Sequence, residues 1–454
     1  MSRTSAINKR LIQVGEWIFI GLLAYMPLHI FLSTWLGSSF HILSTTRVLK
    51  DVILALGFLI TLIPAIQNKW LKDLYKDPLV ILITIYAALT VLLALIKPTD
   101  NQAELLGVVY NTRFLLFFIY GGLLLKLCDK SVIRRSLIAV MASAFIVLIF
   151  GIIQYTVLPN NALSHFGYTK SNGVLPAFFI DEKPDLERIM STIRDPNSLG
   201  SYIIIIISLM VALFARRSKQ RLLATGFILL GLLCLWQTFS RSAWIGCFVA
   251  IVVAIILGLK KISLSKRQLS LIFGIVAGFL VATGVIFYVS RNTYFVQNVI
   301  FHADESTVLE DPNQLRVRFW KESAERITNN PLGSGPGTAG IVSIRNKVQG
   351  GHLNENYYLQ VGSEVGVIGL ILFLAILCLV ALRLFYEIPN SWLAVGLFAS
   401  FIGLLITNFL AHIWSNEAVA YTWWGLAGLI IGTGVSKKTE IKRRTVNKTI
   451  NTKN

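Results

Sequence analysis

Arg316-Val-Arg-Phe-Trp320, Asn330-Pro-Leu-Gly-Ser-Gly-Pro-Gly337 and Gly351-His-Leu-Asn-Glu-Asn-Tyr357 stand in one polar stretch, residues 291–363. On either side of this stretch lies an apolar run that is long enough to cross a bilayer. Loops of this length are uncommon unless they bind a ligand or catalyse a reaction. We therefore expect 291–363 to be an external, periplasmic catalytic loop, which the rest of the chain holds at one face of a membrane.

The composition is that of an integral membrane protein. Of the 454 residues, 55% are hydrophobic and 14% are charged, with a mean hydropathy of +0.67, whereas soluble domains have about 25% charged residues. Apolar runs of about 20 residues predict an all-α polytopic protein, a single membrane domain over 1–454 with about 12 transmembrane helices. The runs are 13–35, 48–66, 78–96, 106–125, 136–158, 197–215, 222–239, 242–259, 269–289, 357–382, 391–411 and 418–435.

The net charge is +19, and its distribution is uneven. If successive apolar runs cross the membrane in alternate directions, most of the positive charge lies on one side. One set of loops, together with both termini, holds 26 of the 42 basic residues. The positive-inside rule makes that side cytoplasmic and puts the loops 159–196 and 291–363 on the external side. The basic tail 436–454 is expected to be disordered in the cytoplasm. Because the charge follows the loops, we expect a lipid bilayer as partner and no nucleic acid.

Three arginines are candidates for the site, either because a charged group is costly to place in or beside an apolar run or because the guanidinium could bind a ligand. Arg241 lies between two apolar runs with almost no loop, and Arg113 lies inside the run 106–125. A buried arginine needs a wet cavity or a partner, so Arg113 should be functional or paired with an acid. Arg241 either snorkels to the interface or binds phosphate oxygens with its planar fork. Arg316 should share a face with Trp320 on an amphipathic helix over 313–328.

Other polar groups of the loops each have two interpretations. Arg318 is a phosphate ligand or a solvated charge paired with Glu322. The turn 330–337 brings backbone amides to a ligand or ends a helix. His352 and Glu355 supply a general base for a hydroxyl or form a polar cap to the next helix. The segment Asp195-Pro-Asn197 belongs to the site or only starts a helix. We expect no metal site and no cofactor.

At these residues the chain resembles the O-antigen ligase / O-antigen polymerase family of bacterial membrane glycosyltransferases. The resemblance spans roughly 190–375 and is carried by Pro196-Asn-Ser-Leu-Gly200, Thr238-Phe-Ser-Arg241, Arg316-x-x-x-Trp320, Pro331-Leu-Gly-x-Gly-Pro-Gly337, Asn356-x-x-Leu-Gln360 and Glu364-Val-Gly-Val-Ile-Gly369. It implies a multi-pass enzyme of the bacterial cytoplasmic (inner) membrane. Such an enzyme moves or polymerises a glycan linked to a polyprenyl diphosphate, such as undecaprenyl diphosphate, onto a sugar or glycolipid acceptor at the outer face.

The resemblance also implies roles for single residues. Arg241 and Arg316 would hold the diphosphate, so that the leaving group is neutralised without a metal. Further candidates for the site are Arg318, Arg194, Arg113, Asn356 and Asn197.

One position departs from the family pattern. Ligases of the family usually have His-Asn, then nine residues, then Gly-x-x-Gly; here Asn356, Gly366 and Gly369 fit, but Glu355 stands in the histidine position. This favours a polymerase or a surface-glycan role of the Gram-positive type over transfer to a lipid A core. Glu355 is the first candidate for the base and His352 the second, in an inverting transfer.

Two functions of other classes remain open. A flippase or transporter of the same lipid-linked glycan predicts ionisable residues and broken helices near the membrane midplane, with repeat symmetry. A structural scaffold for glycan assembly predicts no chemistry at all. Apart from Arg113, the polar groups gather at one membrane face, which favours the enzyme.

Overall fold

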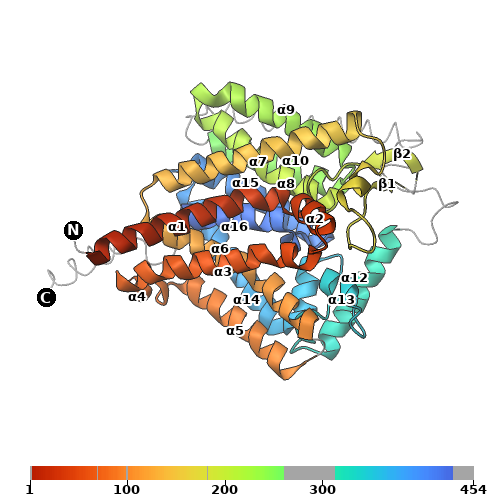
Figure 1. Ribbon diagram of the computed structural model, residues 1–454, viewed down its shortest axis with the longest axis horizontal. Coiled ribbons are helices and arrows are strands. Elements are labelled where there is room, and N and C mark those ends of the chain that lie inside the picture. Colours follow the sequence, from red (N-terminus) through yellow and green to blue (C-terminus); the bar gives the residue numbers. More distant parts are fainter. Residues whose placement is uncertain (1–2, 69, 99–100, 181–182, 260–311, 433–454) are drawn as a thin grey trace.

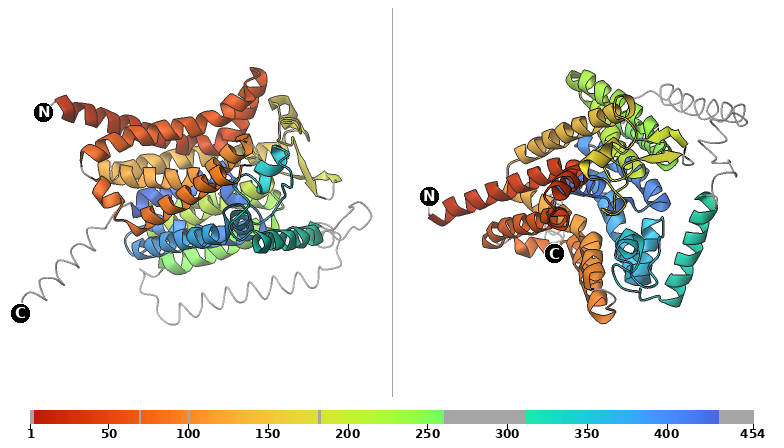
Figure 2. Two further views of the ribbon diagram at one scale, coloured as in Figure 1. Left: turned by 90° about the horizontal axis from the view of Figure 1, so that it is seen from below. Right: turned by 45° about the vertical axis from the view of Figure 1, so that its right-hand side comes forward.

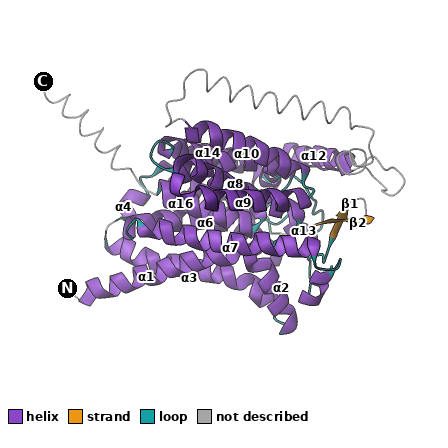
Figure 3. Ribbon diagram, turned by 90° about the horizontal axis from the view of Figure 1, so that it is seen from above, coloured by secondary structure: helices purple, strands orange, loops and turns teal. Residues whose placement is uncertain are grey.

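The structure, a computed structural model, describes residues 3–68, 70–98, 101–180, 183–259 and 312–432. Helices dominate this part of the chain, and its strands form one short antiparallel hairpin, β1 (Phe178–Ile180) with β2 (Lys183–Arg188). The predicted all-α polytopic architecture is confirmed at this level (Figure 3).

Ten helices of the described residues are long and apolar enough to cross a membrane. They match ten of the predicted runs, and the shorter α16 stands where 418–435 was expected. The run 269–289, the tail 436–454 and the first part of the loop 291–363 lie outside the described residues. The α-helices are α1 (Arg3–Tyr25), α2 (His29–Ser39), α3 (Leu43–Gln67), α4 (Leu71–Leu74), α5 (Pro78–Ile96), α6 (Asn101–Leu127), α7 (Ser131–Thr156), α8 (Pro196–Arg216), α9 (Arg221–Gln237), α10 (Arg241–Leu259), α12 (Pro312–Asn329), α13 (Gly340–Arg345), α14 (Tyr357–Glu387), α15 (Trp392–Leu410) and α16 (Glu417–Ile431). The 3₁₀ turns are η1 (Met26–Leu28), η2 (Ala162–Phe166), η3 (Ser218–Gln220) and η5 (Ile413–Ser415).

Helix α8 forms the centre of the bundle. Its isoleucine run, 203–207, is completely buried, as expected for a helix that is apolar on all sides. It packs against α9, α10 and α15, while α16 packs against α6. The β-hairpin, α12 and α13 gather at one end of the bundle, opposite the start of α1 (Figure 1). We call this end of the bundle the site end. Helix α12 lies along the side of the bundle there (Figure 2).

Three helices that begin at the site end, α8, α14 and α16, are capped by short polar side chains. Asp195 caps α8, with Pro196 in the first turn, and its carboxylate accepts a hydrogen bond from Ser198 N (2.9 Å). Asn356 and Asn416 cap α14 and α16 in the same way. Such caps satisfy amides that have no partner inside the helix. The prediction that 195–197 starts a helix is therefore confirmed.

The glycine-rich turn 330–337 packs into a break in α14. Gly366 interrupts this helix with φ 77° and ψ −178°. On one side of the break Gly335 N donates to a carbonyl of α14 (3.0 Å), and on the other Val367 N donates to Pro331 O (2.9 Å). Amides of the turn are therefore engaged within the fold. Of the two interpretations of this turn, the structure favours the one without a ligand.

A buried carboxylate completes this junction. Glu364, 1% exposed, accepts hydrogen bonds from Gly337 N (3.0 Å) and from Asn111 Nδ2 of α6 (2.6 Å). A buried acid needs several such donors. The junction thus connects α6, the turn and α14 near the start of α14.

Gly366→Ala should disrupt this junction. A Cβ at this position would lie 2.5 Å from the carbonyl carbon of Leu332, and the backbone conformation is one that only glycine adopts readily. Strain and overpacking together should cost roughly 2–6 kcal/mol, seen as a lower thermal unfolding midpoint of the purified protein in detergent. Gly350→Ala is the matched control, because Gly350 also has positive φ (71°) but open space around it. Equal midpoints for the two variants would contradict the role of the junction.

Candidate functional site

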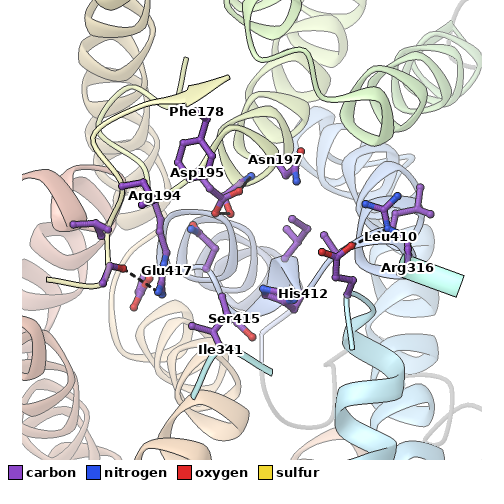
Figure 4. Close-up of a pocket in the computed structure, with 18 residues that line it drawn as sticks. Phe178, Arg194, Asp195, Asn197, Arg316, Ile341, Leu410, His412, Ser415 and Glu417 are labelled. Carbon is purple, nitrogen blue, oxygen red and sulfur yellow. Dashed lines mark hydrogen bonds and ion pairs between the residues drawn. The ribbon is translucent and has the colours of Figure 1, made fainter. Parts of the chain in front are cut away.

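A cavity of about 330 Å³ lies at the site end. Its walls come from the segment before α8, from α12 and α13, and from the connection between α15 and α16 (Figure 4). The volume falls within the range of small-molecule sites, about 300–1,000 Å³. Its ionisable and amide side chains are Arg194, Asp195, Asn197, Arg316, Glu355, His412, Asn416 and Glu417.

Arg316 and Glu355 form an ion pair in the wall of this cavity. Arg316 Nε lies 3.0 Å from Glu355 Oε2, and the two side chains are 25% and 33% exposed. The pair depends on how α12 docks: Trp320, one turn after Arg316, packs edge to face on Phe409 of α15, with ring centroids 5.0 Å apart. The predicted amphipathic helix over 313–328 is confirmed as α12. Its apolar edge turns Arg316 toward the cavity.

Glu355 has an unusual backbone conformation. Its φ is +44°, in the left-handed region, which costs energy for any residue other than glycine and is enriched at functional sites. The next residue, Asn356, is the cap of α14, accepting from Tyr358 N (2.9 Å) and Leu359 N (3.1 Å). The cap and the strained residue before it fix where the carboxylate of Glu355 emerges.

Arg194 and Arg316 lie on opposite sides of the cavity, with His412 between them (Figure 4). Burial lowers the pKa of His412, and the negative charges of Asp195 and Glu355 act in the opposite direction. The imidazole is therefore neutral at neutral pH. Its Nδ1 is buried and has no hydrogen-bond partner among the residues described.

Glu417 belongs to a buried network of four charges beside the cavity. Its Oε1 lies 3.0 Å from Arg113 Nη2 and 3.6 Å from Lys50 Nζ. Asp51 closes the network, 3.0 Å from Lys50 and 3.5 Å from Arg113, and accepts from Tyr421 Oη (3.0 Å). Two cations and two anions balance, which makes burial tolerable. The expectation that Arg113 is functional or paired with an acid is met by this pairing.

Asn197 joins the cavity to two further arginines. Its Oδ1 accepts hydrogen bonds from Ser240 Oγ (2.9 Å) and from Arg188 Nη2 (3.0 Å). The pKa of Arg188 is lowered to about 10, mainly by burial; the charge of Asp195 raises it and the charge of Arg241 lowers it. Arg188 and Arg241 are therefore electrostatic neighbours. Arg241 itself begins α10, directly behind this wall, and does not line the cavity.

Other residues predicted for the site lie elsewhere. His352 is 8% exposed, and its Nε2 is 3.1 Å from Asn354 Nδ2; burial lowers its pKa to about 4. Arg318 is 51% exposed and lies 3.7 Å from Glu322, the local pair that was the alternative interpretation. Neither side chain lines the cavity. The structure thus brings together four candidates, Arg194, Asn197, Arg316 and Glu355.

Sequence reasoning missed His412, Glu417 and Arg188. None of the three belongs to a motif in the sequence. A signal did exist for the first two: the predicted topology puts the connection between the runs 391–411 and 418–435 on the same face as the loop 291–363. Any ionisable residue in that connection was a candidate. Across the described ranges, no group of three or more His, Cys, Asp or Glu side chains could hold a metal ion.

A family model described as O-antigen ligase matches residues 226–374. The matched region includes Arg241, Arg316 and Glu355, whereas Arg194, His412 and Glu417 lie outside it. A search of curated proteins finds none that matches the chain.

Proposed function

Since a family model described as O-antigen ligase matches residues 226–374, we propose that the chain belongs to that family and transfers a glycan from a polyprenyl-diphosphate carrier to an acceptor sugar. The reaction takes place at the outer face of the bacterial cytoplasmic membrane. The observation that carries this proposal is the Arg316–Glu355 ion pair, which combines an anion-binding group and a proton acceptor in one cavity at the site end.

The donor's diphosphate is held by arginines. Arg316 faces the cavity from α12 and Arg194 from the opposite side, and these two contact the diphosphate; Arg241 and Arg188 do not line the cavity and add positive charge from behind Asn197. As the bond between the anomeric carbon and the phosphate oxygen breaks, negative charge grows on the leaving polyprenyl diphosphate. Guanidinium groups that are already in position stabilise that charge. Arg318 has no part in this proposal, because it is exposed and lies 3.7 Å from Glu322 on the same helix.

The acceptor hydroxyl is activated by Glu355. In the structure its carboxylate is engaged by Arg316, and an arriving diphosphate competes for the same guanidinium. When Arg316 turns to the phosphate, the carboxylate becomes available to take the proton of the hydroxyl. The hydroxyl oxygen then forms the new glycosidic bond from the face opposite the leaving group, with inversion. His412 lies between Arg194 and Arg316, where its neutral imidazole accepts or donates a hydrogen bond to the acceptor.

Reconstitution into liposomes tests the function. The purified chain is supplied with an undecaprenyl-diphosphate-linked oligosaccharide, and products are separated on gels and identified by mass spectrometry. We expect longer or transferred glycan together with free undecaprenyl diphosphate. Arg316→Ala should reduce product about 10²- to 10³-fold, as removal of one charge-stabilising donor does in other enzymes. Movement of donor between leaflets with no new glycosidic bond would contradict the proposed enzyme and indicate a flippase.

A further inference from the structure

A second, smaller chamber adjoins the cavity and gathers positive charge. It has a volume of about 110 Å³ and lies among α2, α3, α6 and α13. It shares Arg194 and Glu417 with the first cavity and adds Arg47, Lys50 and Arg345. None of these additional cations was a candidate from the sequence.

Three guanidinium groups converge here on one turn of the chain. Arg47 Nη2, from the start of α3, donates to Asn172 O at 2.7 Å. Arg194 Nη2 lies 3.5 Å from Gly173 O. Arg345, from α13, is close to the same turn, since a Cβ at Gly173 would lie 3.8 Å from its Nε. Three segments that are distant in sequence therefore bring their positive charges to one place.

The acids at this chamber do not neutralise the three arginines. Asp51 and Glu417 also line it, but they are paired with Lys50 and Arg113 in the balanced network. Within the described ranges no ion pair joins Arg47, Arg194 or Arg345 to a carboxylate. Arg47 Nη1 is moreover buried with no hydrogen-bond partner there. Clustered guanidinium groups with an unused buried donor are what a bound oxyanion requires.

We propose that this chamber is a second oxyanion subsite, which holds a carboxylate or phosphate group of an acidic glycan acceptor. It is smaller than a typical ligand pocket, about 300–1,000 Å³, so it suits one charged group of a larger molecule that lies in the adjoining cavity. It lies on the side of Arg194 and Glu417 away from the Arg316–Glu355 pair. This inference rests on the proposed function, which supplies an acceptor beside the donor's diphosphate.

Binding measurements test the subsite without any need for transfer. The full chain in nanodiscs is titrated with three probes: a disaccharide that contains a uronic acid, its carboxyl-reduced neutral form, and undecaprenyl diphosphate. The acidic disaccharide should bind more tightly than the neutral one. Arg345→Gln and Arg47→Gln should weaken the acidic disaccharide about tenfold or more and leave undecaprenyl diphosphate unchanged. Arg345 is exposed, so its replacement should not disturb folding. Lys321→Gln, an exposed charge of α12 that lines neither cavity, is the matched control.

Each other result would overturn the assignment. Equal affinity for the acidic and neutral disaccharides, or unchanged affinity in both arginine variants, would remove the subsite. If Arg345→Gln lost only the binding of undecaprenyl diphosphate, the chamber would instead be a binding site for the donor. If these titrations show no selective binding of the acidic disaccharide while the liposomes still yield product, only the second subsite is contradicted. Absence of product in liposomes would instead count against the transferase.

Discussion

Glu355→Gln should lower the rate of glycosyl transfer about 10²- to 10⁴-fold, the usual contribution of a general base. Glutamine keeps the size of the side chain and an oxygen that can accept from Arg316 Nε, now 3.0 Å from the carboxylate. It cannot take up the proton of an acceptor hydroxyl. Donor binding should therefore remain, and the loss should appear in kcat with little change in KM for the donor. Initial rates of transfer at varied concentrations of a labelled donor measure both.

Replacement of Arg316, the partner of Glu355 in the ion pair, should affect donor binding as well as the rate. Arg316→Gln removes a charge from the diphosphate site, so donor affinity should fall along with the rate. Arg318→Gln is the matched control, since Arg318 stands two residues away on α12 but is exposed and lines neither cavity; its effect should stay within about twofold. If Glu355→Gln weakened donor binding as much as it slowed transfer, Glu355 would be a positioning residue for Arg316. His412 would then be the next candidate for the base.

Local patterns were enough to predict the helices and the end of the bundle at which the candidate cavity lies. Apolar runs of spanning length led to ten of the helices, and the spacing of Arg316 and Trp320 predicted the shared face of α12. The charge of the loops predicted that ionisable groups from distant segments gather at one end. These features depend on composition and on neighbours a few residues apart, which a sequence displays directly.

The pairing inside the site depends on contacts that no short segment reveals. Arg316 meets Glu355 because Trp320 docks on Phe409 and because the turn 330–337 enters the break at Gly366. Both contacts join parts of the chain that are far apart in sequence. The same reason explains why Arg47 and Arg345 were not candidates: neither stands in a motif, and only the fold brings them to the turn at Gly173. A glycine-rich turn likewise does not reveal whether its amides face a ligand or another helix.

Arg113→Leu should strongly destabilise the fold. Arg113 is 4% exposed and is paired with Glu417 (3.0 Å) and Asp51 (3.5 Å), and its guanidinium carbon lies 3.9 Å from the centroid of the Tyr110 ring. Removal of one partner from a buried ion pair leaves an uncompensated charge and costs about 3–5 kcal/mol. Here two carboxylates would keep only Lys50 as counter-ion. The expected result is a strongly reduced yield of folded protein and a lower unfolding midpoint in detergent.

A double variant separates the charge effect from the loss of packing. Glu417→Gln added to Arg113→Leu removes one of the two orphaned carboxylates, leaving Lys50 with Asp51, 3.0 Å away. If uncompensated charge is the cause, the double variant should unfold at a higher temperature than Arg113→Leu alone, because a buried pair is costly to break but less costly to replace as a whole. A double variant less stable than either single one would mean that packing around α6 and α16 dominates. Arg318→Leu, at an exposed arginine, should change the midpoint little, since surface pairs contribute about 0–1 kcal/mol.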